Sequence, residues 1–386
     1  MTQSHSALRR LAPILLIIAV AFIVSACTLE TPKPGDPGFT PQVPLRPAPF
    51  GADPVSLLSW LFTPIFQAFF LVLVLFDQLT GNIAISILLL TLVLRVLLIP
   101  LYRKQLVSTR QIQLLAPELK EIQRKYKGDR QKATVAQQEF YRQRGVNPAS
   151  GCLPIILQLV LIIPMYSVFS QGLTNHNVNG MLSVFGIQLA TLDCASAPIH
   201  DPVTGLVTNP CLNPVAFGIN WGVPEPITTG LFIAGFGISI LALLSAVFQL
   251  VQSRMMLPVR DPRTADDPQV KMQRQMAYFL PLISILYGGI LPAGLFLYWI
   301  GGTVFSMVQQ YLIIGWGGTF PLLGWTPGFA KDHSPRFPVR MPEPRAVAPG
   351  ASTANKPATT RTHSASMPES TIRPNRSRAG RRGRRR

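Results

Sequence analysis

The chain has 386 residues, of which 48% are hydrophobic and only 13% are charged, and its net charge is +18. Because soluble domains carry about 25% charged residues, this composition argues against an ordinary soluble protein and indicates a polytopic membrane protein. The excess of 35 basic over 17 acidic residues indicates anionic partners, namely lipid headgroups, nucleic acid or a ribosome.

The first 26 residues have the features of a bacterial lipoprotein signal peptide. Two arginines precede an apolar segment, residues 11–24, and the sequence Val24-Ser25-Ala26-Cys27 resembles a lipobox. Cys27 is therefore the expected lipidation site, and an uncleaved signal anchor is the alternative. Residues 27–54 are rich in proline, so we expect an extended tether outside the cytoplasm.

Six apolar segments follow, and the loops between them differ sharply in charge. The segments cover residues 57–76, 82–101, 153–170, 227–251, 277–291 and 295–314. Residues 102–144 contain 11 Lys and Arg against four acids, whereas residues 171–226 contain no Lys or Arg. The positive-inside rule therefore places 102–144 and the basic C-terminal region in the cytoplasm, and 171–226 outside.

Parity indicates which apolar segment does not cross the membrane. A chain that starts outside at Cys27 and is inside at Tyr102 crosses an odd number of times, yet two apolar segments precede Tyr102. Segment 57–76 contains Trp60 and Pro64, so we assign it to an outer interfacial helix. We predict an all-α integral membrane protein with five transmembrane helices, N-out and C-in. If Cys27 is not processed, 57–76 also spans.

Residues 102–144 are expected to form a cytoplasmic helical hairpin. Apolar residues at spacings of three and four form a seam on its first arm: Ile112, Leu115, Leu119, Ile122 and Tyr126. Lys127-Gly128-Asp129 is a turn signal, and Pro117 should kink or restart the first arm. The basic surface suits contact with anionic lipid or docking of a partner.

Two further segments carry open alternatives. Cys194 and Cys211 lie in the external loop 171–226 and either form a disulfide or stay reduced. Residues 315–386 are expected to form a disordered basic cytoplasmic tail. Its arginine-rich end suits either ribosomal RNA phosphates or anionic lipid.

Catalytic chemistry is missing from the predicted spans. No Asp, Glu or His falls within them, no Cys/His cluster has metal-ligand spacing, and no glycine-rich phosphate loop follows a strand. We therefore expect that the protein is not an enzyme and that it binds no metal and no cofactor.

A small polar set remains within the spans. Arg95 lies in segment 82–101 without an acid to pair with it, and a charge at the centre of a span costs about 2.5–3.5 kcal/mol. Thr91 shares its helix face. The remaining candidates are Gln158, Gln249, Trp299 and Ser306. They can form separate interhelical hydrogen bonds, with Arg95 extending toward the cytoplasm, or line one hydrated cavity.

Short motifs over residues 81–314 resemble those of the YidC/Oxa1/Alb3 family of membrane protein insertases. They are Gly81-Asn82-Ile83-Ala84-Ile85, Thr91-Leu92-Val93-Leu94-Arg95, Ala116-Pro117-Glu118, Lys125-Tyr126-Lys127, Gly145-Val146-Asn147-Pro148, Gly151-Cys152-Leu153-Pro154, Pro292-Ala293-Gly294-Leu295, Tyr298-Trp299 and Gln309-Gln310. One departure is Val160, where the family often has proline two residues after Gln158.

The resemblance implies an insertase core at residues 55–314, with a groove open to the cytoplasm and lipid and closed toward the outside. Arg95 would be the groove arginine, Trp299 would line the same cavity, and Gln249 is a weaker correspondence. Nascent membrane proteins would be the substrates. The implied partners are the ribosome, the general secretion channel and anionic lipids, with no DNA.

The expected location is a bacterial plasma membrane, with several crossings and a lipid-anchored N-terminus outside, similar to the Gram-positive type of the family. Two alternatives use the same features. An anion or solute channel or carrier would use Arg95 as a binding site, although the chain shows no clear internal repeat. A ribosome-tethering scaffold would insert nothing.

Overall fold

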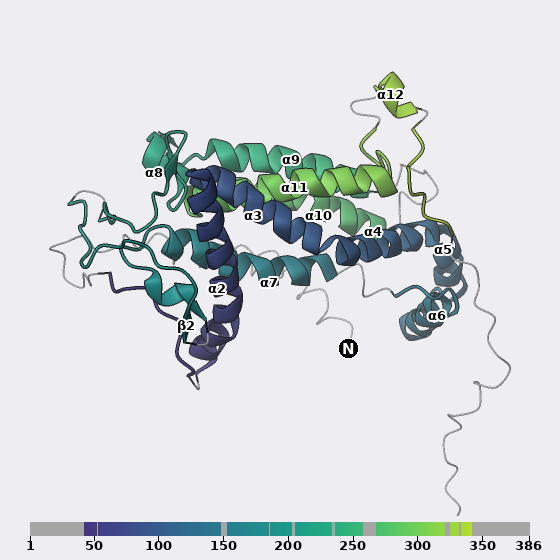
Figure 1. The fold of residues 1–386 in the computed structure, drawn as a ribbon. Coiled ribbons are helices and arrows are strands. Elements are labelled where there is room, and N and C mark those ends of the chain that lie inside the picture. Colours follow the sequence, from purple (N-terminus) through teal and green to yellow (C-terminus); the bar gives the residue numbers. More distant parts are fainter. Residues whose placement is uncertain are drawn as a thin grey trace, which may run out of the picture. The chain divides into compact units, whose positions relative to one another are not determined.

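The computed structural model describes residues 42–51, 53–147, 153–184, 186–202, 205–233, 236–257, 268–320, 325–331 and 333–341. The expected signal peptide 1–26, the lipidation site Cys27, much of the tether and the arginine-rich end of the tail lie outside these residues. The described part is mostly helical (Figure 1).

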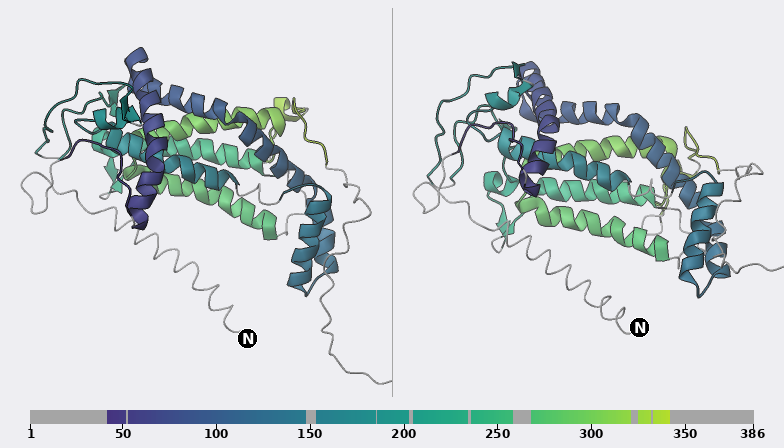
Figure 2. Two further views of the ribbon diagram at one scale, coloured as in Figure 1. Left: turned by 60° about the horizontal axis from the view of Figure 1, so that its bottom comes forward. Right: turned by 90° about the horizontal axis from the view of Figure 1, so that it is seen from below.

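The first described helix, α2 (Pro54–Thr80), runs across the direction of the other long helices (Figures 1 and 2). The Asp53 carboxylate caps its start by accepting a hydrogen bond from Ser56 N at 2.9 Å. Gly81, in the left-handed conformation, closes its end. By length and composition, Ser56–Thr80 is the one described helix that could cross a membrane unaided. The assignment of residues 57–76 to an interfacial helix stays a prediction.

The first predicted span is broken. We expected one helix over 82–101, but α3 (Ile83–Leu97) and α4 (Ile99–Leu114) meet at Leu98 with a bend of 63°. Pro100 explains the break, because its ring and missing N–H cannot continue the helix that precedes it. The bend changes the direction of the chain immediately after Arg95. The pair is long and apolar enough to count as one bent span.

The hairpin is formed by α5 (Ala116–Lys125) and α6 (Arg130–Gln143). Pro117 lies in the first turn of α5, so the predicted restart of the first arm is confirmed. Gly128 has φ +109°, which permits the predicted turn, and Asp129 then caps α6. The core of the hairpin consists of Leu115, Leu119, Tyr141 and Val146.

The remaining long helices run side by side (Figure 2). They are α7 (Leu153–Ser167), which continues into the π-helix η2 (Val168–Gly172), α9 (Ile240–Met256), α10 (Pro268–Leu286), which is followed by the 3₁₀ turn η4 (Tyr287–Gly289), and α11 (Ala293–Ile313). Helix α11 packs against both α3 and α9, and α9 also packs against α10.

The expected span 227–251 begins as a helix only at Ile240. Before it lie the short helix α8 (Glu225–Thr229) and an antiparallel pair, β5 (Phe232–Ile233) and β6 (Phe236–Gly237). Gly230 ends α8 in the left-handed conformation, and Ser239 starts α9 by accepting a hydrogen bond from Ala242 N. Because the whole segment is apolar, we predicted one continuous span and did not recognise Gly230 as a helix end or Ser239 as a helix start.

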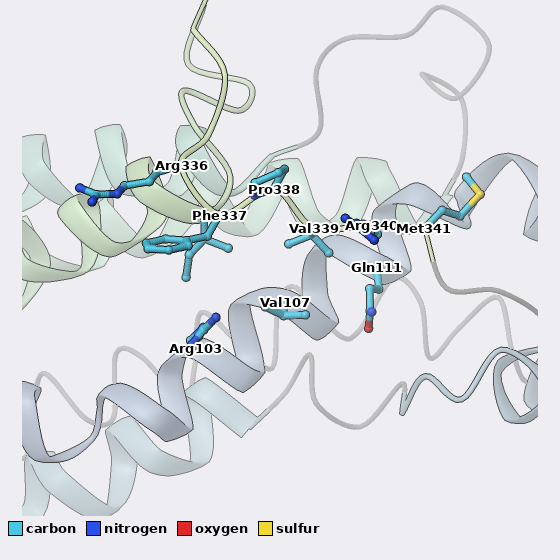
Figure 3. A pocket seen from close by; sticks show the side chains of 10 residues that line it. Arg103, Val107, Gln111, Arg336, Phe337, Pro338, Val339, Arg340 and Met341 are labelled. Atoms are coloured by element: carbon cyan, nitrogen blue, oxygen red, sulfur yellow. The ribbon is translucent and has the colours of Figure 1, made fainter.

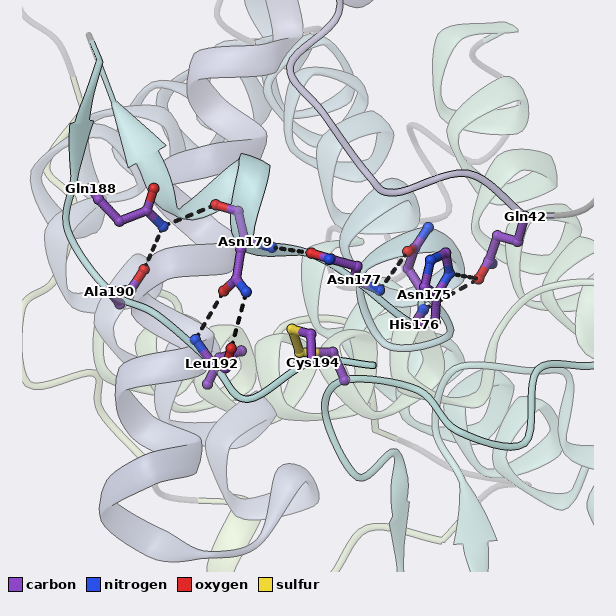
Figure 4. Close-up of a disulfide and its surroundings, with 10 residues drawn as sticks. Gln42, Asn175, His176, Asn177, Asn179, Gln188, Ala190, Leu192 and Cys194 are labelled. Carbon is purple, nitrogen blue, oxygen red and sulfur yellow. Dashed lines mark hydrogen bonds between the residues drawn. A yellow bond between two sulfur atoms is a disulfide. The ribbon is translucent and has the colours of Figure 1, made fainter. Parts of the chain in front are cut away.

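Residues 171–226, which we expected outside the membrane, contain short secondary-structure elements joined by side-chain hydrogen bonds. They include η3 (Asn179–Leu182) and two antiparallel pairs, β1 (Ser183–Val184) with β2 (Ile187–Gln188), and β3 (Val215–Ala216) with β4 (Ile219–Asn220). Cys194 and Cys211 form a disulfide (Figure 4). The end of the tether lies on this loop, where Leu45 N donates to Asn177 O at 2.8 Å.

The expectation of disorder from residue 315 onward is wrong for residues 315–320, 325–331 and 333–341. His333 stacks on Tyr311 with ring centroids 4.3 Å apart, and Phe337 N donates to Leu312 O at 2.9 Å. A short helix, α12 (Gly328–Lys331), lies within this region. Net charge suggested a solvated tail, but its aromatic side chains provide apolar surface that packs.

Candidate functional site

Arg95 lies in the last turn of α3 and is only 8% exposed. Its Nη1 donates to Ser306 Oγ on α11 at 3.0 Å, and its Cζ lies 5.0 Å from the centre of the Tyr102 ring. Ser306 Oγ in turn donates to Gly302 O at 2.9 Å. Among the described residues, no carboxylate forms an ion pair with Arg95. The structure therefore holds a buried cation with hydroxyl and aromatic neighbours.

Gly302 provides the space for this guanidinium. A Cβ built at Gly302 would lie 2.9 Å from Arg95 Nε and 3.0 Å from Arg95 Cζ, so a larger residue there would require the guanidinium to shift. The absence of a side chain at Gly302 leaves room for the guanidinium against α11. We call Arg95, Tyr102, Gly302 and Ser306 the Arg95 cluster.

The other predicted residues divide into those on the same interface and those elsewhere. Thr91 is buried one turn before Arg95, but its Oγ1 donates to Ile87 O at 2.7 Å within α3. Its side chain lies beside Gly301 of α11. Thr91 therefore packs at the α3–α11 interface and has a hydrogen-bond partner of its own.

Gln249 belongs to a different polar group. Its Nε2 donates to Ser245 Oγ at 2.9 Å, and Ser284 Oγ of α10 donates to its Oε1 at 3.0 Å. This group links α9 to α10, as interhelical hydrogen bonds do. No hydrogen bond among the described residues joins Gln249 to Arg95.

Trp299 and Gln158 are also not brought into the Arg95 cluster by any described contact. Trp299 is half-buried, and its ring packs against Phe296 with centroids 5.5 Å apart. Gln158 is half-buried on α7. The aromatic ring that lies against Arg95 is that of Tyr102, which the sequence reasoning did not select. Helical spacing gives no signal for this contact, because the chain bends by 63° at Leu98, between the two residues.

Two buried amides lie on the helices that hold the cluster. Gln105 of α4 and Gln310 of α11 are 5% and 4% exposed, and the Oε1 atom of each lacks a hydrogen-bond partner within the described residues. Gln310 follows Ser306 by one turn, and α11 packs against α4. Buried carbonyls without protein partners are sites for water.

The cluster is suited to attract an anion. Arg95 has donors beyond its single bond to Ser306, and a guanidinium binds carboxylates through paired N–H groups. Within the described ranges, no group of three or more His, Cys, Asp or Glu side chains could hold a metal ion. The arrangement fits transient contact with an acidic group.

Large apolar side chains are exposed on the helices around this cluster. Examples are Leu92, Val93, Val96 and Leu97 on α3, Leu243, Leu244 and Val247 on α9, Leu280 and Leu282 on α10, and Val304 and Val308 on α11. Exposed apolar surface of this extent marks a membrane or a protein interface.

The central part of the chain is similar to known proteins. Residues 75–317 match the family profile described as "60Kd inner membrane protein". A relative from Dinoroseobacter shibae called "Membrane protein insertase YidC" is 31% identical over 240 residues, which cover 62% of this chain and 34% of the relative. A relative of the same name from Fusobacterium nucleatum is 27% identical over 238 residues, covering 62% of this chain and 89% of the relative.

A solved structure, "Active YidC insertase crystal structure with the first transmembrane domain resolved", is also similar, with 22% identity and a TM-score of 0.39 over 67% of this chain and 48% of that one. The chain spans about a third of the length of the relatives from Dinoroseobacter shibae and Wolinella succinogenes.

Proposed function

This chain belongs to the 60Kd inner membrane protein family, the YidC/Oxa1/Alb3 group, and from that premise we propose that it is a membrane protein insertase whose Arg95 cluster receives the polar end of an incoming hydrophobic segment. The observation that carries the proposal is the burial of Arg95 without a carboxylate partner among the described residues. In this account, the substrate supplies the missing acidic or polar group.

The bent α3–α4 pair, α7, α9, α10 and α11 cross the membrane in this proposal, and α2 lies at the outer surface. The exposed apolar side chains on α3, α9, α10 and α11 support contact with lipid. The crosswise direction of α2 supports an interfacial position (Figure 1). The N-terminus is outside and anchored through Cys27, and the basic hairpin is in the cytoplasm.

The first step is electrostatic. An acidic residue that enters the inner leaflet near Arg95 exchanges part of its hydration for attraction to a fixed cation, and this lowers its cost of entry. The unpartnered Oε1 atoms of Gln105 and Gln310 offer water a route beside it. Because Gly302 has no side chain, the Arg95 guanidinium can lie directly against α11.

The second step needs no nucleotide. An apolar segment of about 20 residues gains free energy when it leaves water for hydrocarbon. The segment therefore moves sideways into lipid once its polar end has entered. The protein lowers the barrier for the polar end and leaves the driving force to the substrate.

The partners belong to the same proposal. The hairpin of α5 and α6 and the arginine-rich residues beyond 341 hold a translating ribosome through RNA phosphates. Deletion of residues 342–386 keeps every described residue of the C-terminal region, so it tests the arginine-rich end. Ribosome co-sedimentation at low salt should weaken, and unchanged binding would remove this segment from the mechanism.

The insertase activity is tested with the full-length protein in liposomes. A single-span substrate with an acidic external tail is translated beside them, and protease protection of that tail is measured. We expect a larger protected fraction than in liposomes without the protein. An equal fraction in both would contradict the proposal, and anion flux without insertion would favour the channel alternative.

A further inference from the structure

A second group of cationic side chains lies where residues 333–341 fold back onto α4 and α11. We call these residues the strap. Phe337 N is fixed to Leu312 O, and Val339 packs on a cluster made of Leu106, Ile313 and Ile314. The strap is therefore held by both a backbone hydrogen bond and an apolar contact.

An open cavity of about 480 Å³ lies between the strap and α4 (Figure 3). Arg103, Val107 and Gln111 line it from α4, and Arg336, Phe337 and Arg340 line it from the strap. Figure 3 shows Phe337 of the strap above Arg103 of α4, and the Arg103 guanidinium lies 5.8 Å from the ring centre. Two segments far apart in the sequence thus build one site.

The charge of this cavity is one-sided. Three of its lining residues are arginines, none of the lining residues is acidic, and none of these arginines forms an ion pair within the described residues. Guanidinium groups bind phosphate oxygens through paired N–H donors. The chemistry therefore points to a phosphate group as the ligand.

The apolar surface beside the arginines indicates which kind of phosphate. Phe337 and Met341 are 49% and 50% exposed at the rim. On α4, Ile99 precedes Arg103 by four residues and so shares its helix face one turn nearer to α3. A phosphate with a hydrocarbon chain would contact both surfaces at once, whereas a free phosphate or an RNA backbone would leave the apolar rim in water.

We propose that the strap and α4 form a binding site for the phosphate headgroup of an anionic membrane lipid, with the acyl chains passing along Ile99 toward the exposed face of α3. Bound lipid would connect α4, which directly follows Arg95, to the end of α11. The site does not depend on the insertase activity, because the lipid is a resident ligand and not a substrate.

The test uses the purified full-length protein in detergent, titrated with dioleoyl phosphatidylglycerol or dioleoyl phosphatidylcholine, and native mass spectrometry to count retained lipids. The pocket variant carries Arg103→Gln, Arg336→Gln and Arg340→Gln. A matched control carries Arg124→Gln, Lys127→Gln and Lys132→Gln, three exposed cations of the hairpin. Both variants lose the same charge, and helix content by circular dichroism checks that both fold.

We expect the wild type to retain one phosphatidylglycerol in preference to phosphatidylcholine, and the pocket variant to bind it roughly tenfold or more weakly, because each basic residue near anionic headgroups contributes measurably. The control should stay close to wild type. Equal weakening of both folded variants would show a general charge effect and overturn the proposal. Displacement of the lipid by inorganic phosphate or by short single-stranded RNA at equal concentration would overturn it as well.

Discussion

Replacement of Arg95 by alanine should slow the insertion of substrates with acidic tails and leave substrates with neutral tails almost unchanged. The variant removes the buried cation but keeps the helix, since alanine is the best helix former. Arg95→Lys keeps a positive charge at the same place, although it loses the planar donor pair. Ser306→Ala removes the hydrogen-bond partner of Arg95 and keeps its charge.

The size of the effect follows from the charge separation. An acidic side chain that passes beside Ser306 comes within roughly 8 Å of the guanidinium, where two unit charges attract by about 2 kcal/mol at an effective dielectric constant near 20. Loss of that attraction in the transition state corresponds to about a 30-fold lower rate. Because Arg95 is buried, we use a dielectric constant near 20 and not the value of about 80 for bulk water.

The assay compares initial rates of insertion into proteoliposomes for two substrates that differ only in an Asp or Asn in the external tail. Arg95→Ala should slow the acidic substrate by about 30-fold, whereas Arg95→Lys and Ser306→Ala should stay within about fivefold of wild type. If Arg95→Ala inserts the acidic substrate as fast as wild type, the electrostatic reasoning is wrong. An equal loss for both substrates would also refute it, because the loss would then not depend on charge.

Three further predictions follow from the geometry. Gly302→Ala, whose Cβ would displace the flexible end of the Arg95 side chain but leave its charge, should slow acidic substrates by no more than about fivefold, like Arg95→Lys, whereas Gly301→Ala should slow them by less than about twofold in the same assay. Cys194→Ser should destabilise the loop of residues 171–226 by about 3 kcal/mol, because it opens a bridge between residues 17 apart in sequence; hydrogen exchange of this loop would measure the loss, and unchanged protection would contradict it. Burial, with a smaller contribution from the charge of His200, lowers the pKa of His176, so the folded loop favours the neutral ring. The contribution of His176 to the stability of the loop should be fully present above about pH 6.5 and decline as the pH falls below that value. Hydrogen exchange, corrected for the pH dependence of the intrinsic rates, should show this decline in wild type but not in His176→Gln.

The sequence predicted the helices wherever apolar runs and local signals agreed. Pro117 restarted the first arm of the hairpin, and Gly128 with Asp129 formed its turn. The prediction failed where the apolar run concealed a local signal. Pro100 ended α3 inside an expected span, and Gly230 delayed the third expected span until Ile240.

The C-terminal region shows the opposite error. Its basic composition suggested disorder, but Tyr311, His333 and Phe337 order the part that follows α11. Aromatic residues spaced irregularly among prolines give no periodic signal. The sequence therefore does not predict that the strap packs on α4 and α11. Charge described the chemistry of this segment but not its conformation.

The candidate site was only partly predictable. Arg95 was recognisable as a charge in an apolar segment, and Ser306 as a polar residue in another. Their hydrogen bond joins residues 211 positions apart, so it depends on how α3 packs on α11, which the sequence does not specify. Gly302 lies one turn before Ser306 on α11, but a single glycine in an apolar helix does not show which side chain packs against it.

The central claim is that the substrate passes the polar face of α11 beside Arg95. It is tested most directly by photocrosslinking a stalled nascent single-span protein to full-length protein that carries a photoreactive amino acid at Ser306 or at Val308. Val308 is exposed on another face of the same helix. The account predicts that the acidic tail of the nascent chain crosslinks at position 306 and not at position 308. Crosslinks to the tail at 308 alone would contradict it.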